Sequence, residues 1–317
     1  MTAVPQIEKK DTRSGFGQGL LLAGRANDSV VALCADLKGS LKMDAFATEF
    51  PDRYIECGIA EANMIGVAAG LALDGHVPFA GTFAAFATGR VYDQIRQSVA
   101  YSNANVKICA SHAGITLGED GATHQILEDI GMMRMLPNMT VLVPADYNQT
   151  VAATLAAAAH CGPVYLRFGR PSVPNFTNPS EPLQIGKAQK LRKGADITLI
   201  ATGHMVWHSL QAAELLSREG IQAEVLNIHT IKPLDAEAIL ESVKCTKAVV
   251  TAEEHMANGG LGDAVAQLLA ENLPCPQEHV AIRDQFGQSG TPAQLMEHYG
   301  LTTQAVAESA KRAMARR

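Results

Sequence analysis

The densest group of side chains able to do chemistry lies in residues 111–125, Ser-His-Ala-Gly-Ile-Thr-Leu-Gly-Glu-Asp-Gly-Ala-Thr-His-Gln. Two histidines and two carboxylates stand there among three glycines. Glycine lets the backbone approach a ligand closely, and imidazole and carboxylate groups exchange hydrogen bonds with a polyhydroxylated substrate. The alternative is a polar surface loop that makes only its own turn hydrogen bonds. We interpret the segment as a candidate substrate-binding loop.

The second candidate segment, residues 57–73, contains a single carboxylate, Glu61. Almost all of its remaining residues are small or apolar. This composition predicts a helix that is buried on almost every side. Burial disfavours the ionised form of a carboxyl group, so an unpaired one there needs a partner to share its proton, and a ring nitrogen would serve. A first-turn glutamate stabilised by the helix dipole, or a buried ion pair, would also explain the residue. The helix alone does not decide between them.

The elements that must position these segments follow from the pattern of apolar residues. From residue 12 to residue 170, β-branched apolar runs alternate with longer small-residue or amphipathic runs, which predicts an α/β domain with a doubly wound parallel sheet. The expected strands are residues 30–34, 106–110, 141–143 and 164–168, and the expected helices are residues 15–26, 60–73, 83–101 and 147–160. The loop at 111–125 then lies at the carboxyl edge of the sheet, where α/β proteins bind ligands.

A proline-rich stretch, residues 170–184, follows this domain and has the composition of a linker. Beyond it the alternation restarts, which predicts a second, smaller α/β domain. We therefore expect a first domain over residues 1–175, a linker over 176–190 and a second domain over 191–317.

Composition and charge narrow the classes of function. The net charge of −6 comes without a basic stripe, so no nucleic-acid partner is expected. No apolar run approaches the ~20 residues that span a bilayer, and residues 1–11 lack the features of a signal peptide, which predicts a cytoplasmic protein without membrane contact. The six cysteines stand singly without a CxxC pair, so we expect buried, reduced thiols and assign no metal to this chain.

Residues 118–125, Gly-Glu-Asp-Gly-Ala-Thr-His-Gln, resemble the GEDGPTHQ loop of the transketolase family. Other segments resemble the family in the same order over nearly the whole chain. They are Asp11-Thr-Arg13, Ala35-Asp-Leu37 with Ser40, Gly58-Ile-Ala-Glu61, Thr82-Phe-Ala-Ala-Phe86, Leu166-Arg-Phe-Gly-Arg170, Ile228-His-Thr-Ile-Lys-Pro-Leu234 and Val250-Thr-Ala-Glu-Glu254.

The resemblance implies the pyrimidine-binding domain of a thiamine-diphosphate enzyme followed by a transketolase C-terminal domain. The family's first domain holds magnesium and the cofactor's diphosphate through a Gly-Asp-Gly motif and a later Asn, and the sequence has no acceptable copy of that motif. The resemblance thus implies the beta-type half of a split transketolase. Thiamine diphosphate would be shared with an alpha-type partner subunit that holds Mg²⁺, in an assembly of two copies of each chain (α2β2).

Carried over residue by residue, the resemblance assigns catalytic roles to Glu61, at the aminopyrimidine ring nitrogen, and to His124, at the oxygens of the reacting carbons. The residues expected beside the cofactor's pyrimidine are Asp36, Leu37, Glu61, Phe83 and Phe86. The two phenylalanines are spaced to share a helix face, although such pairs are common in plain cores. The family often has a third aromatic one turn further on, where this chain has Gly89 and Arg90. Arg90 either lies on a helix surface or reaches a neighbouring subunit.

Four residues match the family's phosphate-binding set: Arg13, Ser40, His112 and Arg170. Two guanidiniums with a hydroxyl and an imidazole suit a phosphate dianion, so the resemblance implies a sugar phosphate substrate. Asp120 would accept a hydrogen bond from an acceptor hydroxyl, and His124 would also contact the substrate.

The implied reaction is transfer of a two-carbon ketol unit from a ketose phosphate to an aldose. The alternatives are the beta subunit of a 2-oxoacid dehydrogenase, which shares the architecture and the glutamate, a fragment of a deoxyxylulose-phosphate synthase, and a scaffold without catalytic activity. The sequence does not identify the sugar, which could be a pentose phosphate or a branched or sulfonated sugar.

Overall fold

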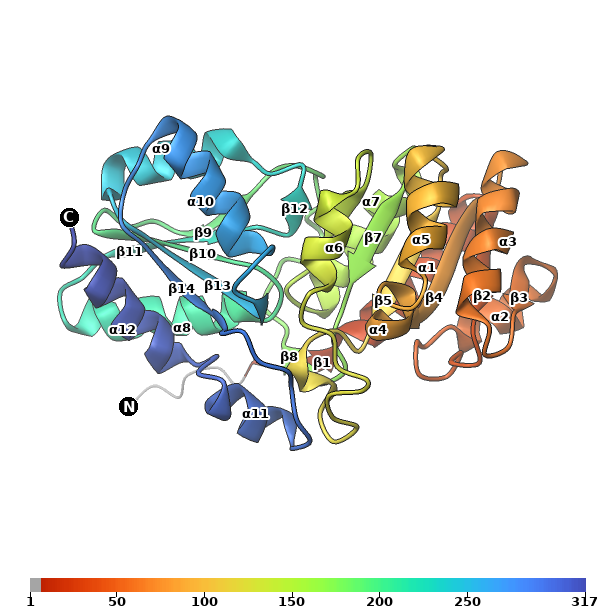
Figure 1. Cartoon of the computed structure of the whole chain (residues 1–317), viewed down its shortest axis with the longest axis horizontal. Coiled ribbons are helices and arrows are strands. Elements are labelled where there is room, and N and C mark those ends of the chain that lie inside the picture. Colours follow the sequence, from red (N-terminus) through yellow and green to blue (C-terminus); the bar gives the residue numbers. More distant parts are fainter. Residues whose placement is uncertain (1–6) are drawn as a thin grey trace.

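A computed structural model describes residues 7–317 and shows two α/β domains side by side (Figure 1). The first contains a seven-stranded sheet. Its strands, in spatial order, are β12 (Thr230–Lys232), β6 (Thr140–Leu142), β7 (Val164–Arg167), β5 (Lys107–Ser111), β4 (Val77–Phe83), β2 (Val30–Cys34) and β3 (Tyr54–Glu56). Every pair is parallel except β12 with β6. The predicted parallel sheet is confirmed.

Both faces of this sheet are covered, because its strands are apolar on both sides. Along β2, Val31 and Leu33 pack in the cluster that includes α3 (Glu61–Leu73), while Val30 and Ala32 pack with α1 (Thr12–Ala26) on the other face. Successive side chains of a strand point to opposite faces, so this fully buried strand needs helices on each. The doubly wound arrangement predicted from the alternation is therefore present, with α7 (Tyr147–Ala159) beside α1.

The helix predicted over residues 83–101 is wrong in its first part. Phe83 is the last residue of β4, and the helical segments after it are short: α4 (Ala84–Ala87), α5 (Tyr92–Gln94) and the π-helix η2 (Ile95–Tyr101). The backbone leaves the helical region at Thr88 (φ −127°, ψ −72°), and Gly89, a poor helix former, follows. Phe83 and Phe86 therefore do not share a helix face.

The second domain also has helices on both sides of a sheet (Figure 1). Its five strands are β14 (Gln277–Ile282), β13 (Val249–Met256), β10 (Ile197–Ala201), β11 (Ala223–Asn227) and β9 (Gln189–Arg192). Helices α8 (Met205–Arg218) and α12 (Thr303–Met314) pack on one face, and α9 (Ala236–Thr246) and α10 (Leu261–Asn272) on the other. None of the helices between residues 7 and 317 has the length and apolarity needed to cross a bilayer.

Two short strands make pairings that the sequence pattern did not indicate, and one of these pairings joins the two predicted domains. Strand β12 belongs to the predicted second domain, yet it extends the first sheet by pairing with β6. Strand β8 (Ser172–Pro174) lies within the proline-rich stretch and pairs with β1 (Lys9–Asp11). Each strand has only three residues, which is too short for periodicity to reveal.

A buried ion pair lies where the domains meet. Asp129, on α6 (Asp129–Met135), accepts hydrogen bonds from Arg167 Nε at 2.7 Å and from the Tyr165 hydroxyl at 2.6 Å. Arg167 also donates to the backbone carbonyl of Glu254, in β13 of the second domain, at 2.9 Å. The first domain's charge pair is thus bonded directly to the second domain.

The cysteines depart from the sequence-based expectation of buried thiols. Cys34 and Cys109 are buried, but Cys161 and Cys245 are exposed. All are unpaired with one another, so none forms a disulfide.

Candidate functional site

The predicted site residues gather at the carboxyl edge of the first sheet. Asp36 follows β2, Phe83 ends β4 and His112 follows β5. These strands are parallel neighbours, so their ends meet at one edge. Glu61 and Arg13 reach the same edge from the first turns of α3 and α1, because helices that connect parallel strands run antiparallel to them.

Four rings form a continuous row across this edge. The ring of Phe83 lies 3.9 Å from the His112 imidazole and 6.0 Å from the ring of Phe86, with interplanar angles of 29° and 20°. The His124 ring meets Phe86 edge-on at 5.4 Å. Although Phe83 and Phe86 do not share a helix face, the strand-to-helix turn brings them together. The row offers flat apolar surface of the kind that binds a planar ring.

Glu61 lies beside this row and is paired with a residue of its own chain. Its side chain is 5% exposed, and its Oε1 atom accepts a hydrogen bond from Arg90 Nη1 at 2.9 Å. The guanidinium of Arg90 lies over the ring of Phe86, 4.1 Å from its centroid. Of the explanations left open by the sequence, the chain shows a first-turn glutamate together with an ion pair that is only partly buried, because the side chain of Arg90 is 49% exposed. Arg90 lies on the turn between α4 and α5 and not on a helix surface.

Helix α3 is less buried than its composition predicts. Ala62, Gly66, Gly70 and Leu73 are exposed, and together they form one side of the helix. A Cβ atom added to either glycine would meet nothing within 4 Å. The prediction of a helix buried on almost every side is therefore wrong for this chain by itself. An apolar composition does not require that the helix be buried by its own chain.

His112 is held in a strained and dehydrated position. Its backbone has φ 57°, which is uncommon for residues other than glycine, and its ring Nδ1 lies 2.7 Å from the Ser111 hydroxyl. Burial lowers the pKa of His112 to about 3, with the nearby charges of Arg13 and Arg170 acting in the same direction. The imidazole is therefore neutral at pH 7, so it can offer a hydrogen bond but no charge.

The two predicted arginines flank His112 and are held by oxygen atoms. Arg13 Nη1 donates to the backbone carbonyl of Ser40 at 3.3 Å, which brings that segment to the site. Arg170 Nη1 donates to the Leu117 carbonyl at 2.6 Å and to Glu119 Oε2 at 3.0 Å. The sequence reasoning gave no role to Glu119, and this acid is the present partner of Arg170.

The glycine-rich loop needs its glycines for its backbone conformation and for contact with the second domain, whereas the sequence analysis expected close approach to a ligand. Gly114, Gly118 and Gly121 all have positive φ, at 77°, 95° and 75°. A Cβ atom at Gly114 would lie 2.3 Å from the carboxylate of Glu254. Left-handed backbone and close approach both favour glycine here.

The second domain supports this loop from behind. Glu254 Oε1 accepts a hydrogen bond from the backbone N–H of Thr116 at 2.7 Å. Gln125 Nε2 donates to the carbonyls of Ile115 and of Gln288, both at 3.0 Å, and Gln288 belongs to the second domain. These two contacts between the domains join residues 138 and 163 positions apart, so the sequence could not reveal them.

The remaining predicted residues lie at the margin. Leu37 is half-buried against the first domain's core, and Asp36, with φ 57°, is exposed. Asp120 is exposed on the loop, while His124 is half-buried and its Nδ1 lies 3.0 Å from the Thr123 hydroxyl. Between residues 7 and 317, no three His, Cys, Asp or Glu side chains gather as potential metal ligands.

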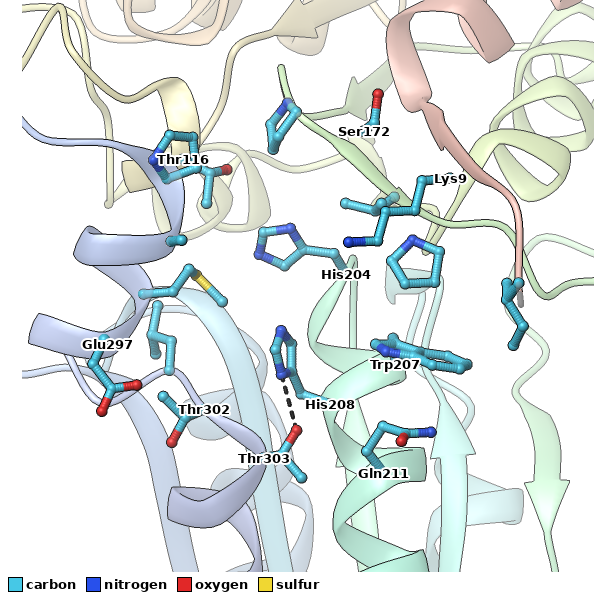
Figure 2. A pocket seen from close by; sticks show the side chains of 18 of the residues that line it. Lys9, Thr116, Ser172, His204, Trp207, His208, Gln211, Glu297, Thr302 and Thr303 are labelled. Atoms are coloured by element: carbon cyan, nitrogen blue, oxygen red, sulfur yellow. Dashed lines mark hydrogen bonds between the residues drawn. The ribbon is translucent and has the colours of Figure 1, made fainter. Parts of the chain in front are cut away.

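A separate cavity of about 720 Å³ opens between the two domains (Figure 2). Figure 2 shows Trp207 with His204 and His208 on one side, and Thr302 and Thr303 on the other. Among the described residues that line this cavity, Thr116 belongs to the predicted loop, but none is a residue to which the sequence assigned a catalytic, cofactor-binding or substrate-binding role. The candidate site is therefore the open edge of the first sheet and not this interdomain cavity.

Two family descriptions match the chain. The description "Transketolase, pyrimidine binding domain" matches residues 8–175, and "Transketolase, C-terminal domain" matches residues 186–306. Together they cover most of the sequence.

Relatives of similar length match this chain over nearly their whole sequences. The chain is 46% identical over 305 residues to the "6-deoxy-6-sulfo-D-fructose transketolase subunit SqwH" of Clostridium sp. (strain MSTE9), covering 96% of this chain and 95% of the relative. It is 38% identical over 299 residues to an apulose-4-phosphate transketolase subunit of Phocaeicola vulgatus, covering 94% of this chain and 96% of the relative. A solved structure described as "Split gene transketolase, inactive beta4 tetramer" is 46% identical, with a TM-score of 0.91, over 96% of this chain and 99% of that one.

Proposed function

Because the chain belongs to the transketolase family, we propose that it is the beta-type subunit of a split transketolase that transfers a two-carbon ketol unit from a ketose to an aldose. The observation that carries the proposal is a buried carboxylate, Glu61, beside a row of aromatic rings whose other end meets two arginines. One end suits a planar, proton-exchanging ring and the other suits an anionic sugar.

The residues present fit the pyrimidine half of thiamine diphosphate. Glu61 would exchange a proton with a pyrimidine nitrogen through its carboxyl group, and Phe83 and Phe86 would cover the ring and exclude water. Asp36 and Leu37 would border the same ring. When bound, thiamine diphosphate supplies a nucleophilic carbon and an electron sink for the two-carbon fragment. The partner subunit would hold the diphosphate and Mg²⁺.

The opposite end of the site would hold the substrate. Arg13 and Arg170 supply two positive charges, and neutral His112 and the Ser40 segment add hydrogen bonds. His124 would contact oxygens at the reacting carbons, and Asp120 would accept from an acceptor hydroxyl. The named sugars of both relatives carry an anionic group, a sulfonate in one and a phosphate in the other. We propose that the substrate here is also an anionic sugar.

The exposed side of α3 supports assembly with further subunits. Leu73 is 77% exposed, and Ile59, just before the helix, is 76% exposed. Gly66 and Gly70, at which an added Cβ atom would meet nothing within 4 Å, are exposed as well. Apolar surface next to a catalytic carboxylate is costly to leave in water and is typical of a subunit interface. We propose that this face is covered in a complex that contains two copies of each chain.

The proposed function is tested by mixing this chain with the subunit that carries the diphosphate-binding domain, thiamine diphosphate and Mg²⁺. Xylulose 5-phosphate, 6-deoxy-6-sulfofructose and apulose 4-phosphate serve as donors, and ribose 5-phosphate or glyceraldehyde 3-phosphate as acceptor. We expect ketol transfer by the mixture and none by either subunit alone. Lipoyl-dependent decarboxylation without ketol transfer would favour the dehydrogenase, and a complex that binds no cofactor would favour a scaffold.

Replacing Arg170 by glutamine tests the anionic end of the site. One charge-assisted contact to phosphate is lost, so KM for a phosphorylated acceptor should rise roughly 10- to 100-fold while kcat changes less. KM for an acceptor aldose that carries no phosphate should be nearly unchanged. Arg25→Gln, at an exposed ion pair with Glu49, is the matched control. An equal loss with both acceptors would contradict the assignment.

A further inference from the structure

Arg90 contacts Glu61 and Phe86 in the candidate site, and the proposed function uses neither contact. Its Nη1 atom donates to Glu61 Oε1 at 2.9 Å, and its guanidinium carbon lies 4.1 Å from the centroid of Phe86. A flat, delocalised cation therefore lies on an aromatic face and donates an N–H group to the buried carboxylate.

We propose that Arg90 is a placeholder for the cofactor's aminopyrimidine ring in the chain that lacks its cofactor, and that cofactor binding displaces it. This inference rests on the proposed function and adds a step that regulates its site. Arg90 is a positioning residue, because it acts through Glu61 and does not take part in the reaction.

The two flat groups compete for the same partners. The aminopyrimidine would donate to or accept from the carboxyl group of Glu61 and stack on an aromatic face of the row. The guanidinium of Arg90 already uses that carboxyl group and lies on the face of Phe86. A ring that bonds to Glu61 and stacks on Phe86 would overlap the guanidinium, so one must leave before the other enters.

The structure also shows which of the two residues can move. The side chain of Glu61 is 5% exposed and is fixed in the first turn of α3, whereas that of Arg90 is 49% exposed. Arg90 lies on the turn between α4 and α5, directly after Gly89, and its backbone N–H makes only a long bond of 3.4 Å to the Ala85 carbonyl. Arg90 can therefore turn toward solvent while Glu61 keeps its place.

In the chain without cofactor, the Arg90 side chain would stabilise the fold. A buried carboxylate without a counter-charge destabilises the folded chain, and Arg90 supplies that counter-charge until the cofactor arrives. Its removal should therefore have opposite effects on two quantities: the free chain becomes less stable, and the complex binds the cofactor more tightly. A merely structural ion pair would not tighten cofactor binding.

The experiment compares wild-type chain with Arg90→Met, which keeps the length of the side chain but loses its charge and planar fork. Arg96→Met, an exposed change on the neighbouring π-helix, is the matched control. Calorimetric titration of thiamine diphosphate into the complex with Mg²⁺ should give a dissociation constant roughly tenfold lower for Arg90→Met, the effect expected when about one charge-assisted contact no longer has to be broken. Arg96→Met should match the wild type.

Thermal unfolding of the free chain gives a second readout that needs no cofactor. Arg90→Met should unfold at a lower temperature than the wild type, and a second change, Glu61→Gln, should restore much of the loss by removing the unpaired charge. An unchanged or weaker cofactor affinity in Arg90→Met would overturn the placeholder role alone. A wild-type complex that binds no thiamine diphosphate would instead overturn the proposed function on which it rests.

Discussion

Replacing Glu61 by glutamine is expected to lower kcat for ketol transfer by roughly 100- to 10,000-fold, the range in which positioned proton-transfer groups act. Glutamine preserves the size of the side chain and its fit beside Phe86, but it cannot give up or take a proton. The carboxyl group is almost completely buried, so no water molecule can easily replace it. The measurement is steady-state ketol transfer by the assembled complex at saturating thiamine diphosphate.

Two controls separate this loss from failure to fold or assemble. Glu49→Gln removes an exposed carboxylate that pairs with Arg25 and should keep full activity. Size-exclusion chromatography should show that Glu61→Gln forms the same complex as the wild type. If the assembled variant retained kcat within a factor of about ten, Glu61 would not be the proton-exchanging group, because that factor lies below the usual contribution of such groups.

The sequence predicted the fold more completely than it predicted the local course of the chain. Both faces of a doubly wound sheet are buried, so continuous apolar runs such as β2 and long helices such as α1 could be recognised. The segment after β4 could not, because small apolar residues suit the end of a buried strand as well as a helix. Strands β12 and β8 could not be predicted, because they are short and their pairing depends on distant partners.

The candidate site shows the same division between local and distant information. The three loop glycines could be recognised locally, but the contact that excludes a side chain at Gly114 comes from Glu254 in the second domain. The partner of Glu61 lies 29 residues away, on a turn whose shape depends on the break after α4. The resemblance to the transketolase family placed residues in roles but did not indicate what occupies Glu61 without the cofactor. That information exists only in the packed chain.

Asp129→Asn is expected to produce the largest loss of stability, about 3–5 kcal/mol, because it leaves the buried charge of Arg167 unpaired. Asp129 is fully buried, and Arg167 is only 5% exposed. Burial by itself would raise the pKa of Asp129, but Arg167 and His255 hold it below its usual value, so the carboxylate is charged in the folded chain. Its bonds to Tyr165 and Arg167 are short, at 2.6 and 2.7 Å.

Urea unfolding of the free chain measures this loss, with Arg312→Gln as control. Arg312 pairs with Glu278 at the surface, where one ion pair contributes under about 1 kcal/mol. The double variant Asp129→Leu, Arg167→Met removes both charges and should be more stable than Asp129→Asn, since the cost lies in the unpaired charge. If Asp129→Asn were no less stable than Arg312→Gln, the pair would not hold the domains together.

Arg167 also bonds to the backbone of Glu254, whose side chain supports the substrate loop through Thr116. Asp129→Asn should therefore also raise KM for the sugar substrate.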